Sequence, residues 1–260
     1  MDKKKLVILT PTNRADKMSD LVDSIEKLSN IYDDYIWLVG INNASTEETN
    51  KIVDLINKVK NVAYITNLSG SLGYVRSYLA TVAIKYGEWA TWIDSDDSIG
   101  SVDSLVSIMM RVANNADNSY AMILPTSYES DGVLCDYQSN ENHEEPFNAY
   151  INHDRYQYIW GLIYNSEYLS KRFCFSDCSV FEDVLFMYNI LKDLNSDNKY
   201  IKLNTSWYKR THNNDSASSV LTTATLEGLA ICYEDLCEID REFATSKLKN
   251  LSEYIMRKMR

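Results

Sequence analysis

Apolar residues in the first half of the chain alternate between short continuous runs and helical spacing. The continuous runs, typical of buried strands, cover residues 5–10, 35–41, 62–66, 88–93 and 120–124. Between them, apolar positions recur three and four residues apart, which predicts helices over residues 15–29, 46–59, 72–86 and 102–114. Regular alternation of strand and helix predicts an α/β fold with a Rossmann-like, mostly parallel sheet flanked by helices.

Local residues predict where two of these helices begin and end. Ser45 or Thr46 is the expected N-cap of helix 46–59, and Glu47 and Glu48 follow in its first turn, where the helix dipole favours acids. Gly87 follows helix 72–86 as its expected C-cap.

The second half of the chain is less regular. Residues 128–145 are polar and predict a hairpin or a loop, whereas the aromatic-rich stretch 156–164 is strand-like. Apolar spacing predicts a helix over 180–194, and the segments 199–203 and 206–210 are expected to be short strands. The remainder, 220–260, predicts a C-terminal helical extension.

Size and charge narrow the possible functions. The 260 residues suit one large domain, and a net charge of −11 argues against nucleic-acid binding. An anionic substrate would also be repelled unless a cation or local basic residues offset this field. The five cysteines contain no C-x-x-C pair, and the N-terminus has no apolar leader. We therefore expect reduced thiols and a cytoplasmic protein.

Three carboxylates follow directly on the apolar run that ends at Ile93, in the segment Asp94-Ser95-Asp96-Asp97. Like charges at the end of a buried strand are costly, and a hard divalent cation such as Mg²⁺ or Mn²⁺ would remove that cost. The alternative is a solvated turn, with Ser98 or Ser101 capping the following helix.

Polar residues also follow the other predicted strands of the first half, at 10–13, 42–46 and 69–73. The carboxyl ends of parallel strands meet at one edge of a sheet, where ligands of open α/β folds bind. Each of these loops is ordinary taken alone. Their convergence with residues 94–97 predicts a binding site at this edge.

This set of motifs resembles the inverting family 2 glycosyltransferases of GT-A fold over residues 5–220. The similar segments in the first half are Pro11-Thr12-Asn13-Arg14, Asn42-Asn43-Ala44-Ser45-Thr46-Glu47, Gly73-Tyr74-Val75-Arg76-Ser77 and Gly87–Asp97. Those in the second half are 158–164, Phe181-Glu182-Asp183-Val184, and Tyr208-Lys209-Arg210 with 216–218. The resemblance implies a nucleotide-sugar-binding half at 1–125, an acceptor-binding half of the same domain at 126–220, and a C-terminal helical segment at 221–260.

The resemblance also implies a role for each matching residue on the donor side. The expected nucleotide-binding residues are Thr10, Pro11, Thr12, Asn43, Arg76, Asp94 and Ser95. Asp96, with His212, is expected to bind Mn²⁺ or Mg²⁺. Asp97 is expected to support these ligands without binding the metal itself. The alternatives without a function are that Arg76 is a solvated helix residue and that His212 is an ordinary surface residue.

On the acceptor side, the resemblance makes Asp183 the general base and gives Glu182 the orientation of acceptor or sugar. Alternatively, the two acids only complement a helix N-terminus. Trp160 is expected to stack on an acceptor sugar, with core packing as its equally plausible alternative.

The main departure from the family pattern is Asn42-Asn43, which stands in place of two aspartates. The second acid normally accepts a hydrogen bond from uracil, and an asparagine amide can both accept and donate. UDP stays the favoured carrier, although Asn43 suits another pyrimidine equally well.

The C-terminal segment interleaves basic and apolar residues, among them Lys247, Lys249 and Met256. Such a helix is expected either to lie on a membrane that holds a lipid-linked acceptor or to pack on its own domain.

These observations predict a metal-dependent inverting glycosyltransferase. It would move a hexose or N-acetylhexosamine from a UDP-sugar to a hydroxyl of a glycan or glycoprotein. The alternative is a non-catalytic module of the same fold that binds nucleotide-sugar or carbohydrate. A nucleotidyltransferase is disfavoured, because residues 10–16 lack the Gly and Lys of a phosphate-binding loop.

Overall fold

The computed structural model describes residues 3–114, 120–137, 145–153, 156–172, 175–197, 199–211 and 222–258. The strands are β1 (Lys4–Thr12), β2 (Tyr35–Asn42), β3 (Val62–Leu68), β4 (Gly87–Trp92), β5 (Ser98–Ile99), β6 (Met122–Ser130), β7 (Val133–Asp136), β8 (Ile163–Asn165) and β9 (Tyr200–Arg210). The helices are α1 (Ser19–Ile31), α2 (Thr46–Ile56), α3 (Leu72–Tyr86), α4 (Val102–Asn114), α5 (Pro146–His153), α6 (Ser166–Arg172), α7 (Asp183–Asp197), α8 (Thr223–Cys237) and α9 (Arg241–Lys258).

One sheet runs through both halves of the chain, in the order β3-β2-β1-β4-β8-β6-β9-β5, with β7 paired to β6. The first four strands are parallel, as the sequence predicts. Beyond them, β8 runs antiparallel to both β4 and β6, while β6 and β9 are parallel. The expected α/β class is confirmed, and each antiparallel pair in the described part of the sheet includes β7, β8 or β9 from the second half.

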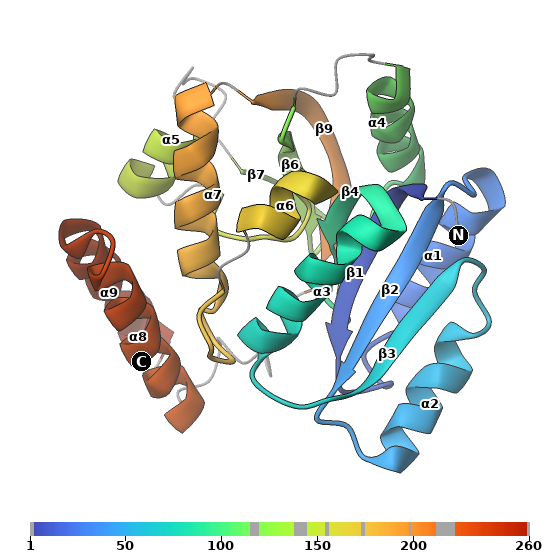
Figure 1. Ribbon diagram of the computed structural model, residues 1–260, viewed down its shortest axis with the longest axis horizontal. Coiled ribbons are helices and arrows are strands. Elements are labelled where there is room, and N and C mark those ends of the chain that lie inside the picture. Colours follow the sequence, from blue (N-terminus) through green and yellow to red (C-terminus); the bar gives the residue numbers. More distant parts are fainter. Residues whose placement is uncertain are drawn as a thin grey trace.

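Helices cover both faces of this sheet (Figure 1). Figure 1 shows α3 and α6 in front of β1 and β4, with α1 behind them. The helices α5 and α7 lie side by side at the far end of the sheet, next to the pair α8 and α9. The carboxyl ends of the parallel strands therefore face α7 and α9 across the molecule.

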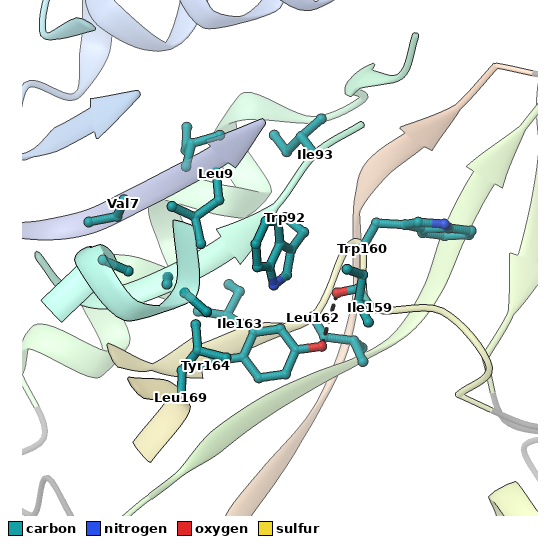
Figure 2. Close-up of a cluster of buried hydrophobic side chains, with 14 of the residues drawn as sticks. Val7, Leu9, Trp92, Ile93, Ile159, Trp160, Leu162, Ile163, Tyr164 and Leu169 are labelled. Carbon is teal, nitrogen blue, oxygen red and sulfur yellow. Dashed lines mark hydrogen bonds between the residues drawn. The ribbon is translucent and has the colours of Figure 1, made fainter. Parts of the chain in front are cut away.

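A cluster of buried hydrophobic side chains fills the core where β4 meets β8 (Figure 2). The Trp92 ring is fully buried and meets Phe175 edge-on at 5.8 Å between ring centroids. Figure 2 shows Trp92 and Tyr164 among Leu9, Ile163 and other apolar side chains. The Tyr164 hydroxyl donates to the Ile159 carbonyl at 3.0 Å, so this buried polar group is paired. Residues 94–97, which follow β4 in the chain, therefore lie next to a closely packed part of the core.

Several predictions for the second half need correction. The stretch 156–164 is mostly irregular, and strand β8 covers only Ile163–Asn165. The two strands expected at 199–203 and 206–210 form the single strand β9, whose pairing with β6 is irregular near Ser206. The hairpin alternative for 128–145 holds for β6 and β7. The boundary proposed at 125 falls inside β6.

Local signals at the helix ends mostly act as expected. Ser45 accepts from the Glu48 amide as N-cap of α2, and Ser101 accepts from the Ser104 amide at the start of α4. Gly87 is the C-cap of α3, as expected, and its amide donates to the Ala83 carbonyl. Its backbone is extended (φ −155°), and a Cβ there would lie 2.5 Å from the Val7 side chain. Gly87 lets β4 approach β1 closely.

Among the helices in the described part of the chain, none is both long enough and apolar enough to cross a membrane.

Candidate active site

A cavity of about 770 Å³ opens at the carboxyl ends of β1, β2 and β4 and extends to α7 and α9. Its donor-side lining includes Pro11, Thr12, Asn42, Asn43, Arg76, Asp94, Ser95, Asp96 and Asp97. Its opposite wall includes Tyr158, Trp160, Glu182, Asp183, Arg210, Lys247 and Asn250. The fold therefore brings most of the residues predicted from the sequence to one place, although Pro11 and Asp183 are 172 positions apart in the chain.

Asp97 is held by the protein itself. It is buried, and one carboxylate oxygen accepts from the Tyr208 hydroxyl. The other oxygen accepts from the Thr211 amide at 2.7 Å. Tyr208 lies near the end of β9 and Thr211 follows that strand directly, so Asp97 connects the loop after β4 to β9. This placement suits the supporting role expected for it.

Arg76 links the two sides of the cavity. Its Nη2 donates to Asp94 at 2.9 Å, and its Nε lies 3.2 Å from a Glu182 carboxylate oxygen. The residue is 4% exposed, so it is no solvated helix residue. Within the described chain, Nε and Nη1 have no hydrogen-bonding partner in good geometry, although both are buried. The guanidinium thus neutralises two acids and keeps donor capacity at the cavity wall.

Burial makes three acids of the cavity, Asp97, Glu182 and Asp183, harder to ionise. Burial raises the pKa of Glu182, and the Arg76 guanidinium opposes the rise, while neighbouring Asp183 adds to it. Burial likewise raises the pKa of Asp183, against the effects of Arg76 and Lys247. The pKa of Asp97 lies well above its usual range, through burial first and then repulsion from Asp94. Such displaced values are typical of functional sites.

Backbone contacts of the segment 175–182 position Glu182, its last residue, and Asp183, the first residue of α7. The Ser176 amide donates to the Glu182 carbonyl at 3.1 Å, and the Gly73 amide of α3 donates to the Cys178 carbonyl at 3.0 Å. Phe181, just before the acids, has φ 67°, a left-handed conformation that is unfavourable for a bulky side chain. Strain of this kind, about 1–3 kcal/mol, is often stored beside functional residues.

The predicted nucleotide-binding residues do not all face the cavity. Pro11 and Thr12 line it, but Thr10 is fully buried and its hydroxyl accepts from the Trp37 indole at 3.0 Å. The Asn43 side chain pairs with the Gly70 backbone, donating at 2.7 Å and accepting at 3.3 Å. Asn43 therefore joins two loops, although it also lines the cavity.

Ser95 and Asp96 line the cavity next to Asp94, as the sequence predicts. Among the described residues, no group of three or more His, Cys, Asp or Glu side chains forms a ready metal cage. His212, the other expected metal ligand, lies outside the described residues, as do residues 216–218.

Trp160 sits inside an aromatic stack. Its ring lies 12° from parallel to both Tyr158, at 4.5 Å, and Tyr208, at 4.8 Å between centroids. The Arg210 guanidinium lies 5.5 Å from the Tyr158 ring centroid and 5.8 Å from that of Trp160. This arrangement supports the packing alternative for Trp160, since the stack holds Tyr208 against Asp97. Its contact with an acceptor stays a prediction.

Sequence reasoning did not select Arg210 and Lys247 as site residues. Arg210 is the last residue of β9, and this position at the strand end is its local signal. Lys247 stands in a basic amphipathic helix in which nothing local distinguishes it from Lys249. Its neighbours on α9 show the packing alternative: Phe243 and Ala244 face the domain, and Lys247 is 5% exposed.

No family model matches the chain, and neither does any curated protein sequence. Solved structures do. TarS from S. aureus is 17% identical, with a TM-score of 0.59 over 98% of this chain and 43% of that one. Residues 1–349 of TarS, in complex with UDP-GlcNAc, give a TM-score of 0.61 at 16% identity, over 98% of this chain and 72% of that one.

Two other solved structures have the same fold. Glucosyl-3-phosphoglycerate synthase from M. tuberculosis is 12% identical (TM-score 0.57, 90% of this chain and 80% of that one). The mannosyltransferase PcManGT from Pyrobaculum calidifontis, in complex with GDP-Man and Mn²⁺, is 10% identical (TM-score 0.58, 98% and 70%). This chain spans less than half the length of full TarS. Sheet order, cavity and these similarities together show that the chain has the GT-A fold of glycosyltransferases.

Proposed function

We propose that this chain is a metal-dependent, inverting glycosyltransferase that uses a nucleotide-sugar donor. One observation carries the proposal: a single cavity holds Asp94–Asp97 after β4 and Glu182–Asp183 at the start of α7, on a GT-A fold. UDP or UDP-GlcNAc is bound in three of the similar structures and GDP-Man in a fourth. We favour a UDP-sugar, a hexose or N-acetylhexosamine, and a glycan, glycoprotein or lipid-linked hydroxyl acceptor.

The carboxylates suit a divalent cation that arrives with the donor. Mg²⁺ and Mn²⁺ sites of nucleotide enzymes commonly use one or two carboxylates, with substrate phosphates and waters completing the shell. Asp96 lines the cavity and belongs to the acidic segment that resembles the family's motif. Asp96 is therefore the residue that would hold the metal, which would stabilise charge on the leaving diphosphate.

The protein groups account for the remaining chemistry of a single displacement. Asp183 takes the proton of the acceptor hydroxyl as that oxygen bonds to the anomeric carbon and the bond to the diphosphate breaks. Attack opposite the leaving group inverts the anomeric centre. Glu182, fixed by Arg76, orients the acceptor or the sugar, and Arg210 offers a further positive charge at the cavity wall.

The first test is release of nucleotide from a panel of UDP-, GDP-, CDP- and dTDP-sugars with Mn²⁺. Release from one donor is expected, with loss of at least about a hundredfold in Asp96→Ala and in EDTA. The matched control is Asp54→Ala, since Asp54 is an exposed carboxylate on α2. Donor binding without release, with or without candidate acceptors, would favour the non-catalytic binding module. Absence of metal-dependent nucleotide binding by calorimetry would refute both.

A further inference from the structure

The C-terminal helix α9 is anchored on the wall that carries the acids. The Phe243 ring packs 5.6 Å from Tyr150 of α5 and 4.9 Å from Tyr188 of α7, measured between centroids. Asp240, just before α9, accepts from the Tyr188 hydroxyl at 2.8 Å and from the Phe243 amide at 3.0 Å. The position of α9 relative to α7 is therefore fixed at its first turn.

One turn further along α9, Lys247 enters the cavity. Lys247 is almost fully buried, and it lines the cavity from α9 together with Asn250, Leu251 and the acid Glu253. Its Nζ lies 5.1 Å from the Tyr150 ring centroid, a cation–π distance. The Tyr150 hydroxyl in turn donates to the Val184 carbonyl at 3.1 Å, so Lys247 is fixed against the first turn of α7.

The charges at this turn explain why a buried ammonium is tolerated. Burying a charge is expensive unless opposite charge lies nearby. Asp183 lines the same cavity as Lys247, and it directly precedes Val184, whose carbonyl accepts from the tyrosine that packs on Lys247. The charge of Lys247 lowers the pKa of Asp183, against the larger effect of burial. The titratable and charged groups that act on or are acted on by Asp183 are Arg76, Asp94, Glu182, Lys247, Tyr164, Cys178 and Cys232.

We propose that Lys247 is a positioning residue for Asp183, and that its ammonium group keeps this carboxylate ionised and ready to accept a proton. The inference rests on the proposed function, because it assigns Asp183 the role of base. It also makes α9 part of the active site rather than a packing appendage. The side chain acts through Asp183 and through the Tyr150 contact, so the expected signature is a change in pH dependence.

The kinetic test compares nucleotide release by wild type, Lys247→Met and Lys247→Arg from pH 5 to 9, with the donor found in the screen. For Lys247→Met, the acidic limb of the kcat profile should move up by about one pH unit, with about tenfold slower release at pH 6 and recovery at high pH. Lys247→Arg should restore the wild-type limb. The control Lys249→Met removes an exposed lysine of the same helix and should leave the limb unchanged.

A second test needs no turnover. Melting temperatures in chelator are compared for wild type, Lys247→Met, Asp183→Asn and the double variant. At pH 7.5, Lys247→Met should lower Tm more when Asp183 is present than in the Asp183→Asn background. Because the pKa of Asp183 is raised in the fold, its ionisation costs stability as pH rises, and loss of the cation increases that cost. At about pH 4 the difference should vanish.

The outcomes separate the two proposals. If no donor supports turnover, the proposed function fails, while the stability cycle still decides whether Lys247 and Asp183 act as a pair. Equal Tm losses in both backgrounds would overturn the inference. So would a Lys247→Met enzyme that is slowed equally at every pH, since that result indicates a merely structural lysine.

Discussion

At the scale of single residues, the acids of the cavity are balanced largely by groups of the protein. The sequence suggests that Asp94, Asp96 and Asp97 need a cation to coexist, and the structure supplies part of the answer itself. Arg76 pairs with Asp94, and Tyr208 and Thr211 donate to Asp97. Asp96 lines the same cavity, and it is the carboxylate for which we propose a metal. Arg76 also lines the cavity, so its expected contact with the nucleotide stays a prediction, and its observed partners are the two acids.

Replacement of Arg76 tests this reading. Removing one partner of a buried ion pair leaves an uncompensated charge, which costs about 3–5 kcal/mol. Arg76→Met is expected to lower kcat for nucleotide release by about a hundredfold or more and to lower Tm, with Arg76→Lys intermediate. If Arg76 served only as a nucleotide contact, KM for the donor would rise with kcat unchanged. Steady-state kinetics in donor concentration separate these results.

At the scale of elements, the site depends on close contact between α3 and the segment 175–182. Gly73 is buried at the first turn of α3, and a Cβ placed on it would lie 1.9 Å from the Ser176 carbonyl oxygen. Ser71, the N-cap of α3, also donates to Asp177 at 2.5 Å. These contacts place Arg76, one turn later, within reach of Glu182.

Gly73→Ala is therefore expected to have two opposing effects on stability. Alanine is favoured over glycine inside a helix by about 1 kcal/mol, but overpacking against a backbone atom costs typically 1–3 kcal/mol or more. The clash should win, because a carbonyl oxygen cannot turn aside as a flexible side chain can. We expect a lower Tm and at least about tenfold slower nucleotide release. Ser77→Ala, on the next turn of α3, is the control, and a Gly73→Ala protein as stable and active as that control would contradict the expected clash.

At the scale of the whole molecule, the net charge and the buried acids both lower the stability of the fold as pH rises. The net charge of −11 makes the folded chain repel itself at neutral pH. Burial also raises the pKa of Glu182 to about 7 and that of Asp97 well above its usual range. Groups with raised pKa contribute stability at low pH that is lost as pH rises through the folded value.

In chelator, Tm is therefore expected to be higher at pH 6 than at pH 8. Thermal unfolding followed by circular dichroism measures this. Glu182→Gln removes one of the responsible groups and should reduce the difference between the two pH values. A Tm that stays constant or increases from pH 6 to pH 8 would show that these buried acids are not the dominant pH-dependent term.

The order of the strands illustrates what lies beyond a local pattern. Periodicity correctly predicts β1 to β4 and their helices, because each of these elements has its own local pattern. The strands β1, β2 and β3 pair across single helical crossovers, whereas β4 returns to pair with β1. The pattern places 120–124 as the next parallel strand, but β8, which begins 41 positions after β6, lies between β4 and β6. Pairing between distant strands depends on shape and register that no window of sequence contains.

The sequence by itself determined the α/β class, the four parallel strands and the loops at their carboxyl ends, since these follow from local periodicity and from the geometry of strand–helix units. Only the tertiary structure decided which side chains meet. Thr10 points into the core beside Trp37, and Trp160 lies between two tyrosines. Arg76 contacts Asp94 and Glu182, and Lys247 lies in the cavity that holds these acids. Charges and rings interact through distance in space, and distance in space is set by packing.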